Sequence, residues 1–247
     1  MRVAVAGALG RMGREVCAAL SATDDLELVG GFARARSGEA LAEVLCLPKG
    51  AGRLYDDVTD LYDDVKPDVV VDFTVYPTTV DVAREAIERG IAPVIGTTGW
   101  PAEEQVSFED WCDEHEVGAA LVPNFAVGAA LAMRFAEEAA RWFPTAEIVE
   151  LHHDAKRDAP SGTSILTARR IAVAADREDV PIHSVRLRGL LAHEEILFGG
   201  EGEVLTIRHD SLARSSFMPG VLLAVRKVRT LRKLVIGLDT FLQGGAP

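Results

Sequence analysis

The glycine-rich segment near the N-terminus, Gly7-Ala-Leu-Gly-Arg-Met-Gly13, constrains the fold more than any other stretch of the chain. It follows the apolar run Val3-Ala-Val-Ala6, which predicts a buried strand, and precedes an amphipathic run that predicts a helix to about Ala22. Glycines in such a turn allow a tight bend, so that N–H groups at the helix start can face a phosphate. The spacing Gly-x-x-Gly-x-x-Gly departs from the Gly-x-Gly-x-x-Gly form associated with NAD, and packing alone also produces glycine-rich turns. Its position between strand and helix favours a dinucleotide site formed by Gly7, Ala8, Leu9, Gly10, Arg11 and Met12.

Predicted strands and helices alternate along the first half of the chain. Apolar runs predict strands at 26–32, 67–74, 91–95 and 118–122, and helical patterns lie at 41–45, 80–89 and 103–114. The run 67–74 is continuously apolar before its polar end, which is typical of a parallel sheet covered on both faces. The order therefore predicts an α/β fold that begins with a doubly wound parallel sheet of the Rossmann type. The aspartates at 56, 57, 60, 63 and 64 are interpreted as a solvated acidic face, since no metal-ligand spacing is present.

The residues after the second predicted strand bear on the choice of cofactor. An acid at this place accepts a hydrogen bond from a ribose 2′-hydroxyl, whereas a basic residue accommodates a 2′-phosphate. Ala33 stands there, Arg34 and Arg36 follow, and no acid occurs before Glu39. This favours NADPH over NADH, or at least its acceptance, with Arg34 as the first contact and Arg36 as the second. The alternative is that both arginines are solvated loop charges.

Three predicted strand ends, at 72–74, 96–98 and 122–125, complete the predicted cofactor site. Ligands of doubly wound sheets bind beyond the carboxyl ends of the strands, so these ends are placed to meet the nicotinamide. Side chains of Thr97, Thr98 and Asn124 can hydrogen-bond its ribose or carboxamide, although ordinary turn chemistry also explains them. The cofactor residues predicted here are Gly96, Thr97, Thr98, Val122, Pro123, Asn124 and Phe125.

The second half of the chain predicts a smaller α+β domain. A mostly buried helix at 127–142, which includes Phe135, precedes a half-buried strand at 147–152 and a helix at 164–175. Three antiparallel strands are predicted at 182–191, 193–198 and 203–209, giving a mixed sheet with helices on one face. A last helix at 217–226 and a strand at 234–237 are expected to return to the first sheet. The predicted domains are therefore 1–125 with 216–247, which binds the dinucleotide, and 126–215, which binds substrate and mediates oligomerisation.

The segment Glu150-Leu-His-His-Asp-Ala-Lys-Arg-Asp-Ala-Pro-Ser-Gly-Thr163 carries the remaining chemistry. A histidine titrates near neutral pH and suits proton transfer. Lys156 and the N–H groups of Gly162 and Thr163, at a predicted helix start, suit an anionic ligand. Two other interpretations are a metal site, for which the spacing of the two histidines, Asp154 and Asp158 is poor, and a purely structural role. The segment favours a small acidic molecule that must receive a proton, with no metal.

Charge and cysteine content exclude several classes of function. The net charge of −12 argues against a nucleic-acid partner, and no apolar run approaches the ~20 residues of a membrane-spanning helix. Three widely spaced cysteines are typical of reduced cytosolic thiols, and the N-terminus lacks a secretory signal pattern. We therefore expect a soluble cytoplasmic protein.

Together these motifs resemble the dihydrodipicolinate reductase family of bacterial lysine and diaminopimelate synthesis. The resemblance covers nearly the whole chain and rests first on the segment 150–163. Further support comes from Gly7-Ala-x-Gly-Arg-Met-Gly13, Val71-Asp-Phe-Thr74, Gly96-Thr-Thr-Gly99, Pro123-Asn-Phe125 and Arg208-His-Asp210. Against this family the glycine spacing is the usual form, whereas Ala33 replaces a common acid.

The resemblance implies reduction of 4-hydroxy-tetrahydrodipicolinate, a small dicarboxylate, to tetrahydrodipicolinate by hydride transfer from NADPH or NADH. It implies that His152 donates and accepts protons, that His153 contacts the substrate, and that Lys156 is a second proton donor and anion partner. Gly162 and Thr163 would bind the substrate as well. It also implies a homotetramer built through the sheet of the second domain.

Two other functions remain open at this point. One is a different NADP-dependent oxidoreductase with the same first domain, although this leaves the Pro-Ser-Gly-Thr anion site unexplained. The other is a redox-sensing binding protein, for which a basic DNA-binding helix would be needed and none is visible in the sequence.

Overall fold

The computed structural model describes residues 1–48 and 52–242, which divide into two compact units. Unit 1 consists of Met1–Pro123 together with the segment that follows Phe217, and unit 2 is Asn124–Phe217. Residues 243–247 of the predicted first domain lie outside the described residues. In the described part of the chain, no helix combines the length and the apolar character that crossing a membrane requires.

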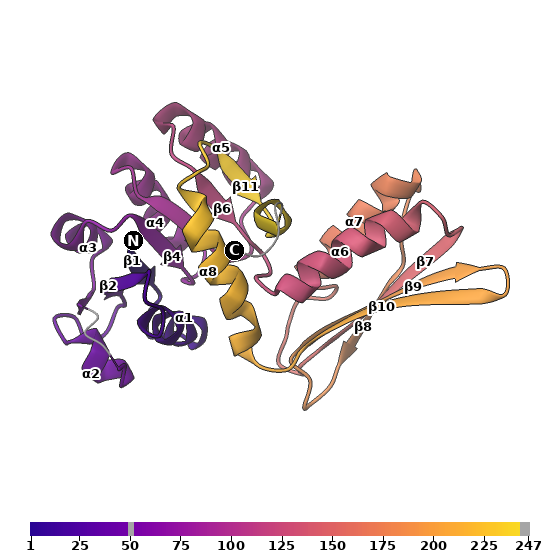
Figure 1. Cartoon of the computed structure of the whole chain (residues 1–247), viewed down its shortest axis with the longest axis horizontal. Coiled ribbons are helices and arrows are strands. Elements are labelled where there is room, and N and C mark those ends of the chain that lie inside the picture. The colour runs from indigo at the N-terminus through magenta and orange to yellow at the C-terminus, as the bar shows by residue number, and fades with distance from the viewer. Residues whose placement is uncertain (49–51, 243–247) are drawn as a thin grey trace. The chain divides into compact units, whose positions relative to one another are not determined.

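Unit 1 contains a seven-stranded parallel sheet (Figure 1). Its strands are β1 (Arg2–Ala6), β2 (Glu27–Phe32), β3 (Arg53–Tyr55), β4 (Val69–Asp72), β5 (Ala92–Ile95), β6 (Ala119–Leu121) and β11 (Leu234–Ile236). The spatial order is β11-β6-β5-β4-β1-β2-β3, so the direction of winding reverses at β1. This is the strand order of Rossmann-type folds, and it confirms the predicted fold class.

Helices of unit 1 pack on this sheet and cover its apolar strands. They are α1 (Arg11–Ser21), α2 (Leu41–Leu45), α3 (Val58–Val65), α4 (Thr78–Glu88), α5 (Ala102–His115) and α8 (Met218–Val228). Helices α1 and α8 pack together, while α4 contacts both α3 and α5. The side chains of Val3–Ala6 in β1 and of all of β4 are fully buried, which agrees with the continuous apolar runs in the sequence.

The acidic stretch after residue 55 is exposed at all five of its aspartates, which agrees with the prediction of a solvated face. It forms the helix α3, and the Asp57 carboxylate caps its N-terminus by accepting from the N–H groups of Thr59 and Asp60. Asp64 pairs with Arg53 and with the Tyr55 hydroxyl of β3. These aspartates therefore stabilise the ends of local elements, a use of acids that amphipathic spacing does not reveal.

Unit 2 contains a four-stranded mixed sheet with two helices on one face (Figure 1). Its elements are α6 (Val127–Ala140), β7 (Thr145–His152), α7 (Gly162–Ala175), β8 (Ile182–Arg186), β9 (Ala192–Gly200) and β10 (Glu203–Ser211). The strand order is β10-β9-β7-β8. Buried alanines of both helices pack on Ile148, Ile196 and Phe198 of the sheet.

The pairing of β8 corrects the prediction of three consecutive antiparallel strands. Strand β8 lies parallel to β7 at the edge of the sheet, and only β9 and β10 form the predicted hairpin. The turn at Gly189 thus separates β8 from β9 without pairing them. In the register of the sheet, Arg186 lies beside His152.

The helix α6 is less buried than its apolar residues predict. Phe135 is 59% exposed, whereas Ala129, Met133 and Ala136 are buried. The small residues form the face that packs on α7 and the sheet, and Phe135 lies outside that stripe.

Candidate active site

The turn that follows β1 is tight and closely packed, as its glycines predict. Gly7 has φ +78°, and a Cβ atom there would lie 2.6 Å from the Phe73 carbonyl oxygen. A Cβ atom on Gly13 would lie 2.1 Å from the Gly7 carbonyl oxygen. Gly10 begins α1 without a side-chain cap, so the first N–H groups of the helix remain available to an anion. Close backbone packing, which only glycine permits, brings this helix start to the end of β1.

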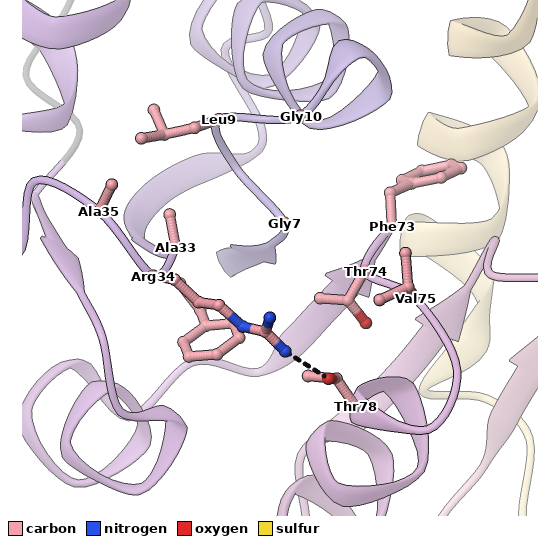
Figure 2. Close-up of a pocket in the computed structure, with 11 residues that line it drawn as sticks. Gly7, Leu9, Gly10, Ala33, Arg34, Ala35, Phe73, Thr74, Val75 and Thr78 are labelled. Atoms are coloured by element: carbon pink, nitrogen blue, oxygen red, sulfur yellow. Dashed lines mark hydrogen bonds between the residues drawn. The ribbon is translucent and has the colours of Figure 1, made fainter.

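A cavity of about 340 Å³ lies beside this turn, at the point where the winding of the sheet reverses (Figure 2). Its walls come from the ends of β1, β2 and β4 and from the start of α4. The lining residues are Gly7, Leu9, Gly10, Phe32, Ala33, Arg34, Ala35, Phe73, Thr74, Val75 and Thr78. This is where a doubly wound sheet binds the adenosine half of a dinucleotide.

Arg34 lines this cavity, and Arg36 does not. The guanidinium of Arg34 donates to the Thr78 hydroxyl at 3.2 Å, as the dashed line in Figure 2 marks. Arg36 is held instead in a two-bond ion pair with Glu39, at 3.0 and 2.6 Å. The role of Arg36 as a second phosphate contact stays a prediction, and it would require the exposed ion pair with Glu39 to open.

A second cavity in unit 1, of about 450 Å³, contains five more of the predicted cofactor residues, Arg11, Met12, Gly96, Thr97 and Thr98. It is lined by Arg11, Met12, Phe73, Thr74, Val75, Tyr76, Gly96, Thr97 and Thr98. Behind it the buried Asp72 carboxylate accepts from the hydroxyls of Thr74 at 2.7 Å and Thr97 at 2.8 Å. Burial raises the pKa of Asp72, although hydrogen bonds from the threonines oppose this shift. Since both hydroxyl protons point to Asp72, a ligand meets the lone pairs of these threonines.

The predicted residues at 122–125 follow β6 and are not among the residues that line these two cavities. Side chains of Val122 and Phe125 are buried, so only their main-chain groups can meet a ligand. Pro123 ends unit 1 and Asn124 begins unit 2. Asn124 accepts from the Ala126 N–H with its side-chain oxygen and lies 3.5 Å from the Thr163 hydroxyl.

In unit 2, His152 is the last residue of β7 and points to the helix-covered face of the sheet, like Glu150. The Nδ1 atom of His152 contacts the fully buried Glu150 carboxylate. Burial lowers the pKa of His152, and the positive charges of Lys156 and Arg186 add to this, whereas Glu150 opposes it. Burial alone would raise the pKa of Glu150, but hydrogen bonds from Arg186, Ser184 and His152 lower it overall. The histidine is thus a partly buried imidazole with one nitrogen already engaged.

The loop after β7 carries the other predicted residues of the segment. His153 lies beyond the end of the strand, and its carbonyl accepts from the Lys156 N–H at 3.1 Å. The Lys156 ammonium donates to the Asp158 carboxylate at 2.7 Å. Neither His153 nor Lys156 lines the cavity that contains His152.

Helix α7 begins where the sequence places an anion site. Ser161 caps it, with its hydroxyl accepting from the Ser164 N–H at 3.1 Å. Apart from the chain neighbours of Gly162 and the backbone of its own helix, no atom of the described structure lies within 4 Å of the place that a Cβ atom of Gly162 would occupy. The N-terminal N–H groups of Gly162 and Thr163 therefore lie beside open space, which suits an anionic ligand.

A small cavity of about 20 Å³ brings His152 together with the start of α7. It is lined by Asn124, Ala129, His152, Ser161, Thr163, Ser164, Ala192, His193, Glu194, His209 and Ser211. The last four polar residues were not assigned as site residues from the sequence. Glu194 lies directly opposite Glu150 in the sheet, and His209 lies opposite Glu194 on the next strand. Strand alternation was the available signal, but it becomes informative only when the register is known.

Glu194 differs from Glu150 because no arginine among the described residues pairs with it. Its Oε1 atom is buried without a partner among the described residues, and the Thr167 hydroxyl lies 3.1 Å from its Oε2 atom. The same hydroxyl lies 3.0 Å from the Thr163 carbonyl and has only one proton to donate. Burial raises the pKa of Glu194, and the charge of Glu150 adds to this, against hydrogen bonds from Ser164 and Thr167. Glu194 therefore keeps its proton to a higher pH than an ordinary glutamate does.

We expect Glu194→Gln to stabilise the protein at pH 8 and to leave its stability unchanged at pH 4. The pKa of Glu194 is higher in the folded state than in the unfolded state. Between these two pKa values the folded protein binds more protons than the unfolded chain, so stability falls as the pH rises. The wild type loses stability in that window, while the glutamine variant does not. A difference of about 1 kcal/mol corresponds to ~2–4 °C in Tm. Calorimetry at both pH values measures it, with the exposed Glu201→Gln as control; a variant less stable at pH 8 would contradict the assignment.

Comparison with known proteins agrees with the two-unit organisation. The family model for the N-terminus of dihydrodipicolinate reductase matches residues 1–125, and the model for its C-terminus matches residues 128–242. A 4-hydroxy-tetrahydrodipicolinate reductase of Moorella thermoacetica is 44% identical, over 98% of both chains. One of Geobacillus thermodenitrificans is 43% identical, over 98% of this chain and 99% of the relative.

Solved structures lead to the same family. The dipicolinate-bound dihydrodipicolinate reductase of Paenisporosarcina sp. TG-14 has a TM-score of 0.83 at 37% identity, covering 97% of this chain and 98% of that one. An amine dehydrogenase of Mycobacterium smegmatis, at 15% identity and a TM-score of 0.69, is similar in fold alone; it covers 97% of this chain and 95% of its own. The chain belongs to the dihydrodipicolinate reductase family.

Proposed function

We propose that the protein reduces 4-hydroxy-tetrahydrodipicolinate to tetrahydrodipicolinate in diaminopimelate and lysine synthesis. The observation that carries this proposal is the placement of His152 beside the N-terminus of α7, since both line one small cavity. A proton donor and an anion site are what a dicarboxylate needs when hydride adds to its conjugated imine. Family membership supports the same reaction.

In this proposal each residue of unit 2 has a separate task. Gly162 and Thr163 bind one carboxylate through their N–H groups at the positive end of α7. Lys156 exchanges Asp158 for a carboxylate of the substrate and serves as a second proton donor, and His153 contacts the substrate. His152 delivers the proton, because its Nε2 atom remains available while Glu150 engages Nδ1. Asp154, Asp158, Pro160 and Ser161 hold the loop.

The nicotinamide cofactor supplies the hydride when bound, and residues of unit 1 would hold it. The turn at Gly7–Gly13 and the start of α1 suit the pyrophosphate, since the helix N-terminus has no side-chain cap. Thr74 and Thr97 would accept hydrogen bonds from the ribose or carboxamide, because Asp72 takes their protons. The main chain of 122–125 and the side chain of Asn124 complete the proposed cofactor contacts. Because the proposed substrate is a small metabolite, we propose a cytoplasmic location for the enzyme. The sheet of unit 2 is the proposed surface through which a homotetramer forms.

The experiment that tests this function follows the oxidation of NADPH and NADH with freshly generated substrate. We expect turnover with at least one of the two cofactors. Pyridine-2,6-dicarboxylate should also raise Tm in the presence of NADPH, because it resembles the planar dicarboxylate substrate. A different NADP-dependent oxidoreductase would show neither effect.

We propose that NADPH is preferred and that Arg34 is the reason. Arg34→Ala should weaken NADPH binding by about 10–100-fold, the value of a lost charge-assisted hydrogen bond of ~1.5–3 kcal/mol. NADH lacks the 2′-phosphate, so its Kd should change little. Titration of nicotinamide fluorescence measures both constants. Arg36→Ala is the matched control, since Glu39 already pairs with Arg36; equal losses for NADPH and NADH in Arg34→Ala would contradict the assignment.

A further inference from the structure

The edge strand β8 brings a half-buried arginine next to the segment 150–163. Arg186 ends β8 and lies beside His152 in the parallel register with β7. Its side chain is only 19% exposed. Arginines are seldom buried to this extent unless a specific partner pairs with them. The partner of Arg186 is Glu150, which is fully buried.

The pair of Arg186 and Glu150 has two-bond geometry. Nη1 donates to Glu150 Oε2 at 2.9 Å, and Nη2 donates to Glu150 Oε1 at 2.8 Å. The planar guanidinium thereby fixes the plane of the carboxylate, which a lysine could not do. Glu150 Oε2 is the same atom that contacts His152 Nδ1.

This geometry determines which nitrogen of His152 carries a proton in the neutral ring. A carboxylate has only lone pairs to offer, so Nδ1 must be the N–H donor to Glu150. The Nε2 atom is then the one that gains and loses a proton. A carboxylate that orients an imidazole in this way also stabilises its protonated form.

Arg186 also reaches the loop that carries Lys156. Its Nη2 atom donates to the Asp158 carbonyl oxygen at 2.7 Å, while the Asp158 carboxylate accepts from the Lys156 ammonium at 2.7 Å. One guanidinium thus links the residue that orients His152 with the residue that holds Lys156. Arg188 makes a superficially similar contact with Asp154 at 2.9 Å, but its side chain is 91% exposed.

We propose that Glu150 and Arg186 form a positioning pair that fixes the Nδ1–H tautomer of His152 and the loop of Lys156. The inference rests on the proposed function, in which His152 and Lys156 act on the substrate. Neither Glu150 nor Arg186 needs to touch the substrate for this role. Other charged or titratable groups near His152 are Lys156 in the loop, His193 and Glu194 on β9 and His209 on β10, while α6 and α7 contribute Ala129, Ser161, Thr163 and Ser164.

The first test is Glu150→Gln, measured by the pH dependence of kcat and by ¹⁵N NMR of the His152 ring. Loss of the carboxylate removes the interaction that raises the pKa of His152, so the fall of kcat with rising pH should begin at lower pH. We expect kcat to fall by about 10- to 100-fold, part of the ~10²–10⁴-fold that general acid catalysis provides. The spectrum should change from a single Nδ1–H tautomer in the wild type to a mixture.

The second test is Arg186→Lys, which keeps the charge and loses the two-bond geometry. We expect a rise in KM for the substrate together with a fall in kcat, because both the Lys156 loop and Glu150 lose their hold. Arg188→Lys is the matched control, two residues away on an exposed contact to the same loop, and should behave as the wild type.

A buried charge left without its partner destabilises a protein by several kcal/mol, so either single variant can fail to fold. The double variant Glu150→Gln/Arg186→Met removes both charges together and keeps the NMR measurement accessible. A single Nδ1–H tautomer in this variant, or an unchanged pH profile in Glu150→Gln, overturns the proposal. The tautomer of His152 is measured without substrate. A wild type with no reductase activity would therefore refute the proposed function, whereas the tautomer would still test the role of Glu150 and Arg186.

Discussion

Replacing His152 with Gln is expected to lower kcat by about 10²–10⁴-fold, the usual contribution of a general acid. Glutamine is close in size and can still donate to Glu150, but it cannot supply a proton at neutral pH. The cavity and the start of α7 remain, so KM and the stabilisation by pyridine-2,6-dicarboxylate should change little. Stopped-flow or steady-state measurements of NADPH oxidation give kcat directly. Lys156→Ala should lose a comparable factor if it too delivers a proton.

His183→Gln is the matched control for His152→Gln. His183 lies on the same sheet, and its ring nitrogen is 2.8 Å from Glu147, yet the side chain is exposed and lies outside the cavity. Its kcat should equal that of the wild type. A His152→Gln enzyme within about threefold of the wild type would remove His152 from the chemistry, whereas loss in both variants would point to a general effect on the sheet.

Gly13→Ala is expected to destabilise unit 1 by roughly 1–3 kcal/mol, although alanine is the better helix former. The added methyl group would lie 2.1 Å from the Gly7 carbonyl oxygen and 2.9 Å from the Ala8 Cα atom, so the backbone must move. Any such movement displaces the start of α1 from the turn that is proposed to bind the pyrophosphate. NADPH affinity should therefore fall by about tenfold or more, since ~1.4 kcal/mol corresponds to a factor of ten. Calorimetry and NADPH fluorescence measure the two effects.

Ala18→Gly on the exposed side of the same helix is the control for that experiment. It should cost about 1 kcal/mol through helix propensity alone and leave NADPH binding unchanged. If Gly13→Ala is instead more stable than the wild type and binds NADPH with unchanged affinity, close packing does not explain why glycine stands at position 13.

Local signals in the sequence were sufficient for most of unit 1. The glycine turn, the apolar runs of β1 and β4 and the alternation of strands and helices all report on neighbours along the chain, and they predicted the parallel sheet. The short elements β3 and α3 were not predicted. Strand β3, for example, is only Arg53–Tyr55, which is too short for a periodic pattern.

Unit 2 shows what local patterns leave out. The apolar alternation of 182–186 predicts a strand but not its partner, and the turn at Gly189 suggested a hairpin with β9. The actual neighbour, β7, lies some thirty residues earlier in the chain. For the same reason the sequence identified His152 and Lys156 through their shared segment and missed Arg186 and Glu194, which become neighbours only through strand pairing.

The interrupted course of unit 1 along the chain has a consequence for biosynthesis on the ribosome. Strand β6 emerges early, but its outer neighbour β11 and the covering helix α8 are translated only after all of unit 2. Until then β6 has an unpaired edge and one sheet face lacks α8, which are the features that make nascent chains prone to aggregation. Unit 2 is contiguous from Asn124 to Phe217 and can fold in the meantime. The unit begun first is thus the one finished last, so the sheet of unit 1 keeps an open edge until β11 has been translated.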